Sequence, residues 1–520
     1  MHDYARARLA DDAGALDPAV ENYKRALAID PASTVVALRS YRQAIESGDS
    51  ALALRAAHLL DQNVALPPDG PLLLMSEALQ KKDWKKARAL SLRLSKEHNF
   101  AFLSPIIDGW ISLGERKYAP PVLPEDGAIA PLTRRYLSQH QALQYLALDD
   151  VENALPFIQD ALTLRTDLLP GFRMVAAARL AALDRKDLAL ALLKIRNKDA
   201  ARLSRNIEAV RKPRPQVRTA AQGYARLLFQ LAEDLSTEHS RSLALSIARL
   251  AAFADPTADE YRIGVARELL ATDHASFALR ELQTIESGSP FASAATDVRI
   301  AAVLATGDED RALSMAQSAA AASDADTSDF VRVAGLLAQQ ENYVAAADEY
   351  QKAIDSFGAQ QPPWSLYLLK GGALEQAGQW DKARAELERA NQLAPDQPVI
   401  LNYLGYAQIE RRQNIDEALA LIQKASGLKP DDPAIKDSLG WAHYVNGNVK
   451  KAIPVLEKAV QGAPDDATVN EHLGDAYWTA GRRFEARYSW EAALIFADQE
   501  AQNRISRKME FGLNPGLAAP

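Results

Sequence analysis

Apolar residues recur every three or four positions along most of the chain, which is the spacing of residues on one face of an α-helix. Glycines, Asp-Pro pairs and short polar stretches interrupt this spacing repeatedly, so the pattern predicts pairs of helices joined by turns. The clearest pairs span residues 365–397, 398–432, 433–466 and 467–498. Weaker helical spacing continues upstream of residue 365, and we therefore expect helices along the whole chain.

The C-terminal pairs repeat their small residues at a nearly constant distance. Three sets of residues keep a period of 34 or 35: Gly405, Gly440 and Gly474; Ala418, Ala452 and Ala486; and Pro395, Pro430 and Pro464. A period of about 34 residues is typical of stacked helical hairpins. Because small side chains let two helices approach closely, we expect these glycines and alanines at the contacts within each hairpin.

The residues around this period form a motif. The first helices contain Leu439-Gly440-Trp441-Ala442 and Leu473-Gly474-Asp475-Ala476-Tyr477, and the second helices contain Ala452, Leu456 and Ala459, then Ala486, Trp490 and Ala493. With these motifs the chain resembles tetratricopeptide repeat (TPR) proteins. The resemblance implies an all-α fold, a right-handed α-solenoid of TPR-like helix-turn-helix hairpins. It also implies a non-catalytic scaffold or adaptor that binds a partner protein or peptide in its concave groove.

The C-terminal motifs are also similar to those of a narrower group. The stretches Leu401-Asn402-Tyr403-Leu404-Gly405-Tyr406, Asp437-Ser438-Leu439-Gly440-Trp441 and Glu471-His472-Leu473-Gly474-Asp475 resemble large TPR proteins of the proteobacterial cell envelope. Some of those are lipoprotein adaptors of carboxyl-terminal processing proteases. The resemblance implies that the partners are such a protease and its substrates, and that the chain brings the substrates to the protease.

The first residues of the chain do not support a location in the cell envelope. Residues 1–8 contain neither the apolar core of a signal peptide nor a lipobox cysteine. Helical spacing is already running within them, so we expect the natural sequence to begin further upstream. We expect the chain to be periplasmic or associated with the outer membrane if an export signal precedes it, and cytoplasmic otherwise.

Interruptions of the helical pattern predict four parts. Residues 1–210 are expected to form degenerate TPR-like hairpins, and 211–364 further degenerate hairpins, with a hinge in the stretch 196–218 that contains Lys212-Pro213-Arg214-Pro215. Residues 365–498 hold the four well-defined repeats. Residues 499–520 are expected to form the end of a C-terminal helix and a flexible tail.

Candidate binding residues follow from the helical period. Residues at positions i, i+4 and i+7 share one helix face, and in TPR proteins the first helix of each hairpin lines the groove. The candidates are therefore Asn402 and Tyr406; Asp437, Trp441 and Tyr444; and Glu471, Asp475 and Trp478. Gly372, one first helix earlier, is expected to leave a gap beside them.

These side chains predict the chemistry of a ligand. Aromatic rings give large contact areas at interfaces, and the carboxylates would repel the C-terminal carboxylate of a peptide. We expect an extended segment with apolar and basic side chains, or a folded partner that presents Arg or Lys. The alternative is that aromatic residues such as Tyr406 and Trp441 only pack against the neighbouring hairpin.

Two irregular stretches have separate interpretations. Residues 196–218 contain eight basic and two acidic residues, a net charge of +6, which suits an acidic partner or an anionic membrane surface, or else a solvated helix and a stiff linker. Residues 99–131 contain five prolines. The alternative function is that of a regulatory or assembly domain associated with an enzyme activity, and residues 99–131 would carry it. Such an activity needs polar groups converging on a cavity near Trp110, Glu115 and Arg116, which we do not expect.

Composition narrows the function further. The chain of 520 residues has a net charge of -8, which gives no general electrostatic attraction for nucleic acid. It has no cysteine, and its eight histidines form no H-E-x-x-H pair. Glycine-rich phosphate loops, G-x-S-x-G elbows and apolar stretches of about 20 residues are also missing. We therefore expect no enzyme activity, no cofactor or metal, no nucleic-acid partner and no transmembrane segment.

Overall fold

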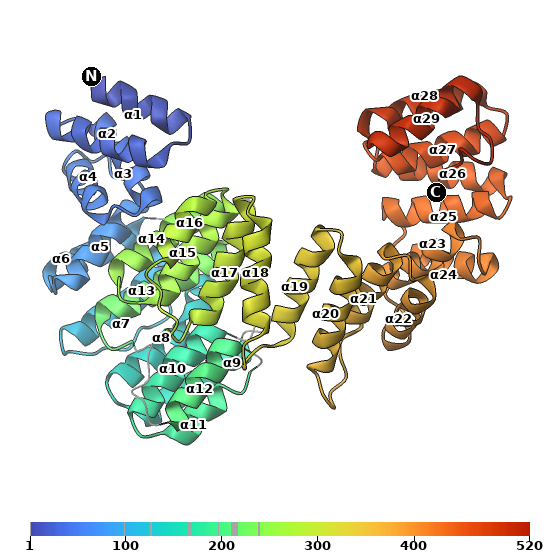
Figure 1. The fold of residues 1–520 in the computed structure, drawn as a ribbon. Coiled ribbons are helices and arrows are strands. Elements are labelled where there is room, and N and C mark those ends of the chain that lie inside the picture. The colour runs from blue at the N-terminus through green and yellow to red at the C-terminus, as the bar shows by residue number, and fades with distance from the viewer. Residues whose placement is uncertain are drawn as a thin grey trace. The chain divides into compact units, whose positions relative to one another are not determined.

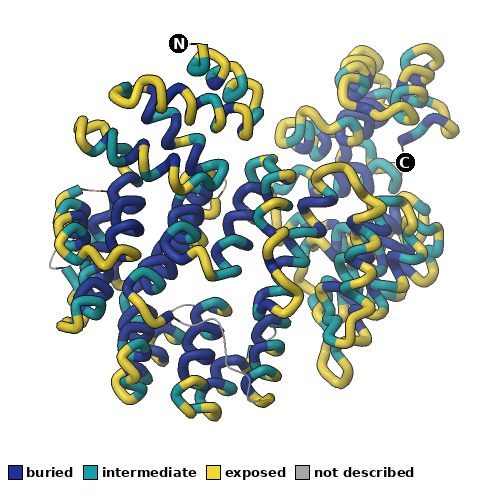
Figure 2. The backbone as a smooth tube through the Cα atoms, turned by 60° about the vertical axis from the view of Figure 1, so that its left-hand side comes forward, coloured by how far each residue is buried: buried dark blue, intermediate teal, exposed yellow. Residues whose placement is uncertain are grey.

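The computed structural model describes residues 2–97, 99–124, 127–164, 169–195, 197–209, 217–237 and 240–519. The chain divides into two compact units, Met1–Met315 and Ala316–Pro520, which we describe one at a time (Figure 1). Every regular element in these ranges is a helix, so the prediction of an all-α fold is confirmed. Within the helices, buried positions alternate with exposed ones at helical spacing, and the turns are mostly exposed (Figure 2).

The first unit contains helices α1 to α17 and a short 3-10 helix. They are α1 (His2–Asp12), α2 (Leu16–Ile29), α3 (Thr34–Ser47), α4 (Ser50–Gln62), α5 (Gly70–Gln80), α6 (Trp84–Lys96), η1 (Ala101–Leu103), α7 (Ser104–Gly114), α8 (Ala130–Ala147), α9 (Val151–Leu164), α10 (Pro170–Ala182), α11 (Lys186–Leu192), α12 (Lys198–Glu208), α13 (Ala220–Leu235), α14 (Arg241–Ala254), α15 (Asp259–Ala271), α16 (Ala275–Leu282) and α17 (Ala292–Ala305). Helix α18 (Glu309–Ala320) spans the boundary between the units.

Helices from distant parts of the sequence pack together in the first unit. Helix α13 contacts α5, α7 and α8, and α14 contacts α3 and α5. Because neighbours surround α13, most of its side chains are buried. At one contact the ring of Trp110 covers Gly223, where a Cβ atom would lie 2.1 Å from the indole. The predicted boundary after residue 210 lies inside this compact unit. Of the stretch 196–218 predicted as a hinge, residues 198–208 form α12, and residues 196 and 210–216 lie outside the described residues.

The second unit is a succession of helical hairpins. Its helices are α19 (Thr327–Gln339), α20 (Tyr343–Asp355), α21 (Trp364–Gln376), α22 (Trp380–Leu393), α23 (Pro398–Glu410), α24 (Ile415–Leu428), α25 (Pro433–Val445), α26 (Val449–Gly462), α27 (Ala467–Thr479), α28 (Arg483–Phe496) and α29 (Gln499–Phe511). Each odd-numbered helix from α19 to α27 packs against the helix that follows it. The pairs α21–α22 to α27–α28 lie within the four repeats predicted from the sequence.

The repeated glycines lie where the two helices of a hairpin meet. A Cβ atom at Gly440 would lie 2.5 Å from Leu456, and one at Gly474 would lie 2.3 Å from Trp490. Such distances are far below van der Waals contact, so only glycine fits at these positions. The 34-residue period thus reflects close helix packing, as the sequence predicted.

Replacing Gly474 by alanine should lower the free energy of unfolding of α27 and α28 by about 1–3 kcal/mol, because the added methyl group overpacks Trp490. Gly335→Ala in α19 is the matched control, since no atom lies within 4 Å of its Cβ position. Alanine favours a helix interior by roughly 0.5–1 kcal/mol over glycine, so the control should be stabilised. Hydrogen exchange in the affected helices measures both changes. A gain of stability in both variants would contradict close packing at Gly474.

Candidate protein-binding surface

The eight candidate residues lie on three successive first helices. Helix α23 contacts α25, and α25 contacts α27, so the three helices form one continuous surface, called here the first-helix face. On this face Asp437, Trp441, Glu471 and Asp475 are buried, and Asn402, Tyr406, Tyr444 and Trp478 are half-buried. The structure therefore brings the predicted residues together, but half of them have little contact with solvent.

Trp441 is at the centre of an aromatic stack. Its ring centroid lies 4.6 Å from that of Tyr444 and 4.0 Å from that of His472, with nearly parallel planes. Only 2% of Trp441 is exposed, so this ring joins α25 to α27. For Trp441 the structure thus agrees with the alternative of packing between hairpins. Tyr406 lies at the edge of the stack, 6.5 Å from His472 between ring centroids.

His472 holds the stack to an acidic residue of the preceding repeat. Its Nδ1 atom lies 2.9 Å from Asp437 Oδ2, and the histidine is completely buried. Burial by itself would lower the pKa of His472, but the Asp437 carboxylate raises it above the ordinary value. His472 therefore connects two repeats from a fully buried position.

The acidic end of the first-helix face is covered by α29 of the same chain. Arg504 donates two hydrogen bonds to Glu471, of 2.9 and 2.8 Å. Lys508 Nζ lies 2.6 Å from Glu471 Oε1 and 2.7 Å from Asp475 Oδ1, and Lys508 has no exposed surface. Burial would raise the pKa of Glu471, but the hydrogen bonds of Arg504 and Lys508 bring it below its usual range. Basic side chains do bind these carboxylates, and they come from within the chain.

The residues that follow α29 return to the same face. Gly512 packs under Trp478, and its φ of 80° is in the left-handed region that favours glycine. Residues 514–516 are exposed, whereas Leu517 and Ala519 are buried. The Ala519 N–H donates to Asp475 Oδ2 at 2.9 Å. The segment expected to be a flexible tail is therefore seated on the candidate residues over residues 512–519.

Ala519 enters the apolar cluster beneath the aromatic stack. The cluster contains Trp441, Ala442 and Ile409 from α25 and α23. Two buried nitrogen atoms of the stack, Trp441 Nε1 and His472 Nε2, have no hydrogen-bond partner within the described ranges.

Sequence reasoning did not identify Arg504 and Lys508, although a signal for them exists. They stand four residues apart in a helix and so share one face. Glu471 and Asp475 have the same spacing, so two basic side chains match two acidic ones. Charge complementarity between first-helix faces and the helix after the last repeat would have located this contact.

The other end of the first-helix face, towards α21, is less covered. Glu375 of α21 accepts hydrogen bonds from Tyr403 at 3.1 Å and from Arg411 at 2.5 Å, which joins α21 to α23. At Gly372 a Cβ atom would meet only the hydroxyl end of Tyr403, 3.4 Å away. Space for a small side chain therefore remains at Gly372, where a gap was expected. Exposed apolar side chains, Leu369 and Val399, lie on the same two helices.

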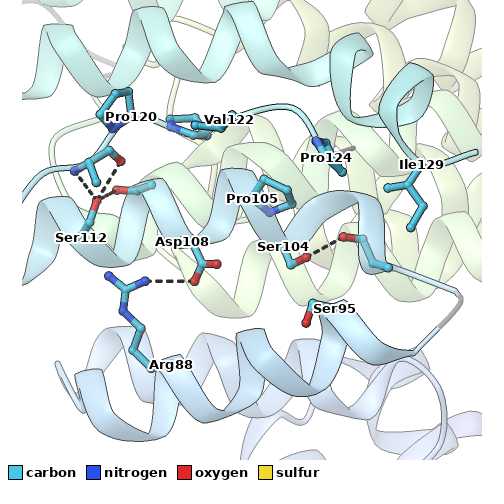
Figure 3. Close-up of a pocket in the computed structure, with 14 residues that line it drawn as sticks. Arg88, Ser95, Ser104, Pro105, Asp108, Ser112, Pro120, Val122, Pro124 and Ile129 are labelled. Carbon is cyan, nitrogen blue, oxygen red and sulfur yellow. Dashed lines mark hydrogen bonds and ion pairs between the residues drawn. The ribbon is translucent and has the colours of Figure 1, made fainter. Parts of the chain in front are cut away.

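A cavity of about 440 Å³ lies in the first unit, beside the proline-containing segment (Figure 3). Its polar side chains bond within the chain: Arg88 pairs with Asp108 at 3.1 Å, and the hydroxyls of Ser104 and Ser112 donate to the carbonyls of Ala101 and Gly109. Prolines and Val122 form much of the remaining wall. The cavity wall is therefore largely apolar, and its polar side chains are already hydrogen-bonded within the chain. These groups give little support to the alternative of an enzyme-associated function.

The residues named for that alternative do not converge on the cavity. Trp110 is buried and donates its indole N–H to His140 Nδ1 at 3.1 Å. Glu115 pairs with Arg88 at 2.9 Å, and Arg116 ends the helix in a left-handed conformation. Neither the tryptophan nor the two charged residues line the cavity wall.

The basic stretch is described only in part. Lys198, Arg202 and Arg205 lie on α12, where Arg202 donates to the Ser287 carbonyl at 2.9 Å. Arg196, Arg211, Lys212 and Arg214 lie outside the described residues. In the part of the chain that is described, we find no cluster of side chains suited to a metal ion and no helix long and apolar enough to span a membrane.

Comparison with known proteins identifies the repeats of the second unit. Two family models described as tetratricopeptide repeat match the chain, one over residues 374–441 and the other over 334–398 and 438–502. No curated protein matches the chain.

Several solved structures are similar to the chain. The APC/C hetero-tetramer Cut9–Hcn1 is 16% identical, with 97% of this chain and 95% of that chain covered and a TM-score of 0.39. A TPR protein of Parabacteroides merdae is 14% identical over 49% and 99% of the two chains, with a TM-score of 0.41. A thermophilic TPR protein of Thermus thermophilus is 17% identical over 36% and 100%, with a TM-score of 0.32.

The stacked hairpins, the glycines at their contacts and the matched ranges agree with one another. The predicted solenoid of TPR-like hairpins is thereby confirmed. Residues 334–502 of this chain match the tetratricopeptide repeat models.

Proposed function

We propose that the chain is a protein-binding scaffold whose first-helix face binds an extended segment of a partner protein. Tetratricopeptide repeats generally mediate interactions between proteins, and their extended surfaces suit long ligands. The observation that carries the proposal is that this face already holds polypeptide, since residues 512–519 lie on it and Ala519 donates to Asp475.

The open end of the face supplies further area for a partner. Tyr406 is half-buried at the edge of the aromatic stack, and Leu369 and Val399 are exposed on α21 and α23. Aromatic residues at the edge of a buried cluster are frequent energetic centres of interfaces. A bound segment would thus contact Tyr406 and continue towards Gly372.

The proposal extends to the adaptor role that the sequence resemblance implies. A protein that brings substrates to a carboxyl-terminal processing protease needs two separate surfaces, one for each partner. The chain has two compact units, and only the second carries the regular repeats matched by family models. In this scheme the first-helix face binds one partner, and the first unit is available to the other.

A photocrosslinking amino acid tests the surface directly. With p-benzoylphenylalanine in place of Tyr406, the full chain should crosslink in cells to an extended segment of one reproducible partner. The same residue in place of Tyr488, which is 73% exposed on α28, is the matched control and should not capture that partner. Equal capture from both positions would contradict the proposal.

A synthetic peptide of the captured segment then gives the energetics. Tyr406→Ala should weaken its binding by about 2 kcal/mol, roughly 30-fold, if Tyr406 is an interface centre. Tyr488→Ala should leave the affinity unchanged, as measured by fluorescence anisotropy. If the captured partner is neither a processing protease nor a substrate of one, the adaptor role is contradicted, but the proposal of a protein-binding scaffold is not.

A further inference from the structure

We infer that residues 512–519 are an intramolecular ligand of the first-helix face, and that a partner must present the same chemistry to replace them. This inference rests on the proposed function, because it identifies the ligand class and the regulation of the same surface. It separates the C-terminal region into a fixed part, α29, and a displaceable part, the segment 512–519.

Helix α29 has the contacts of a permanent element. Lys508 is fully buried between two carboxylates, and Arg504 makes a two-pronged pair with Glu471. Removal of this helix would leave Glu471 and Asp475 without their cationic partners, and separating buried ions from their partners is strongly unfavourable. Partner binding is therefore expected to leave α29 in place.

The segment after α29 is held far more weakly. Between Gly512 and Ala519 the contacts to the repeats are the ring of Trp478 over Gly512, the packing of Leu513 on the cluster around Trp490, the burial of Leu517 and Ala519, and the Ala519 N–H bond to Asp475. The exposed residues 514–516 make only a local turn, in which the Asn514 carbonyl and side chain accept from Leu517 and Gly516. These few contacts oppose the entropy cost of ordering the whole segment, so the segment can be exchanged.

The bound segment defines what a competitor must look like. Ala519 is apolar and lies in the cluster with Trp441, and Leu517 is buried as well. A backbone N–H meets Asp475, whose carboxylate is already paired with Lys508. The ligand is therefore a segment that offers a backbone N–H to Asp475 and a small apolar side chain beside Trp441, as Ala519 does.

A partner can also make contacts that the resident segment does not make. The buried nitrogen atoms Trp441 Nε1 and His472 Nε2 are unpartnered within the described ranges. Buried polar groups without a hydrogen bond are unfavourable, so a ligand whose carbonyl oxygens reach these nitrogens gains over the resident segment. This difference gives an incoming partner segment the means to displace residues 512–519.

The test uses a fluorescent peptide with the sequence of residues 512–520 as the probe. The full chain should bind it at least ten times more weakly than a chain that stops after Phe511, because the resident segment occupies the face. A full-length variant, Ala519→Asp, should also bind the peptide, since the new carboxylate faces Asp475 and expels the resident segment. Pro515→Asp adds the same charge at an exposed position and is the control that should behave like the unchanged chain.

Each outcome decides the inference. Equal binding to the full and shortened chains would overturn the intramolecular ligand but leave a peptide-binding face. Failure of both the shortened chain and Ala519→Asp to bind, with unchanged helical content, would overturn the ligand class. In either case the crosslinking experiment at position 406 tests the proposed function independently, because that experiment does not use this peptide.

Discussion

Replacing Lys508 by methionine should lower the free energy of unfolding of the helices α27 to α29 by about 3–5 kcal/mol. The methionine fills a similar volume but removes the ammonium group between Glu471 and Asp475, which is fully buried. The two carboxylates are then left close together with only Arg504 as a cationic partner. Hydrogen exchange of the amides in α27 and α29 measures the loss.

Two comparisons separate charge from packing at this position. Lys458→Met, at an exposed position on α26, should change stability by no more than about 0.5 kcal/mol. Combining Lys508→Met with Asp475→Asn removes the carboxylate that has lost its cation and leaves Glu471 paired with Arg504, so it should recover most of the loss. If the single variant is as stable as the unchanged chain, the buried ion cluster does not hold α29 to the repeats.

Replacing Trp490 by alanine should cost about 3–5 kcal/mol in the same helices, because it empties a large site that no neighbour can fill. Trp490 has no exposed surface and lies against Gly474. Its ring centroid is 5.2 Å from that of Trp478, and its indole N–H donates to Asp475 Oδ1 at 2.9 Å. The substitution thus removes both the packing of the last hairpin and one of the donors that hold Asp475.

A smaller substitution distinguishes these two contributions. Trp490→Phe keeps an aromatic ring but loses the indole N–H, so it should cost less than Trp490→Ala. The exposed Tyr488 of the same helix provides the control, and Tyr488→Ala should be nearly neutral. Thermal unfolding and hydrogen exchange of α27 and α28 give the measurements. A loss below about 1 kcal/mol for Trp490→Ala would show that the last hairpin relaxes around the missing ring.

The stability of the last repeat and the state of the binding surface are therefore linked through one residue. Asp475 accepts hydrogen bonds from Trp490, Lys508 and the Ala519 backbone. The first contact belongs to the hairpin, the second to α29 and the third to the displaceable segment. Loss of the third contact leaves the first two in place, which is why we expect the segment to leave without unfolding the repeat.

The periodic sequence was sufficient to place the repeats and the faces of their first helices. Gly440 and Gly474 are close to Leu456 and Trp490 because a 34-residue period with small residues has one simple packing solution. The spacing of Asn402, Asp437 and Glu471 likewise put the candidate residues on adjoining helices. In the first unit the period is degenerate, and the packing of α13 against α5, α7 and α8 had no counterpart in the local pattern.

The sequence by itself determined the helical hairpins, their register and the acidic and aromatic character of one face, because these follow from local spacing. Only the tertiary structure decided what lies on that face. Lys508 meets Glu471 at a separation of 37 residues, and Ala519 meets Asp475 at a separation of 44. The shared spacing of Glu471 with Asp475 and of Arg504 with Lys508 hints at the first contact, but no pattern in the sequence indicates the second. They arise because α29 packs on the last repeat with its basic side chains towards Glu471 and Asp475, and because the chain turns back at Gly512 and brings Ala519 to Asp475.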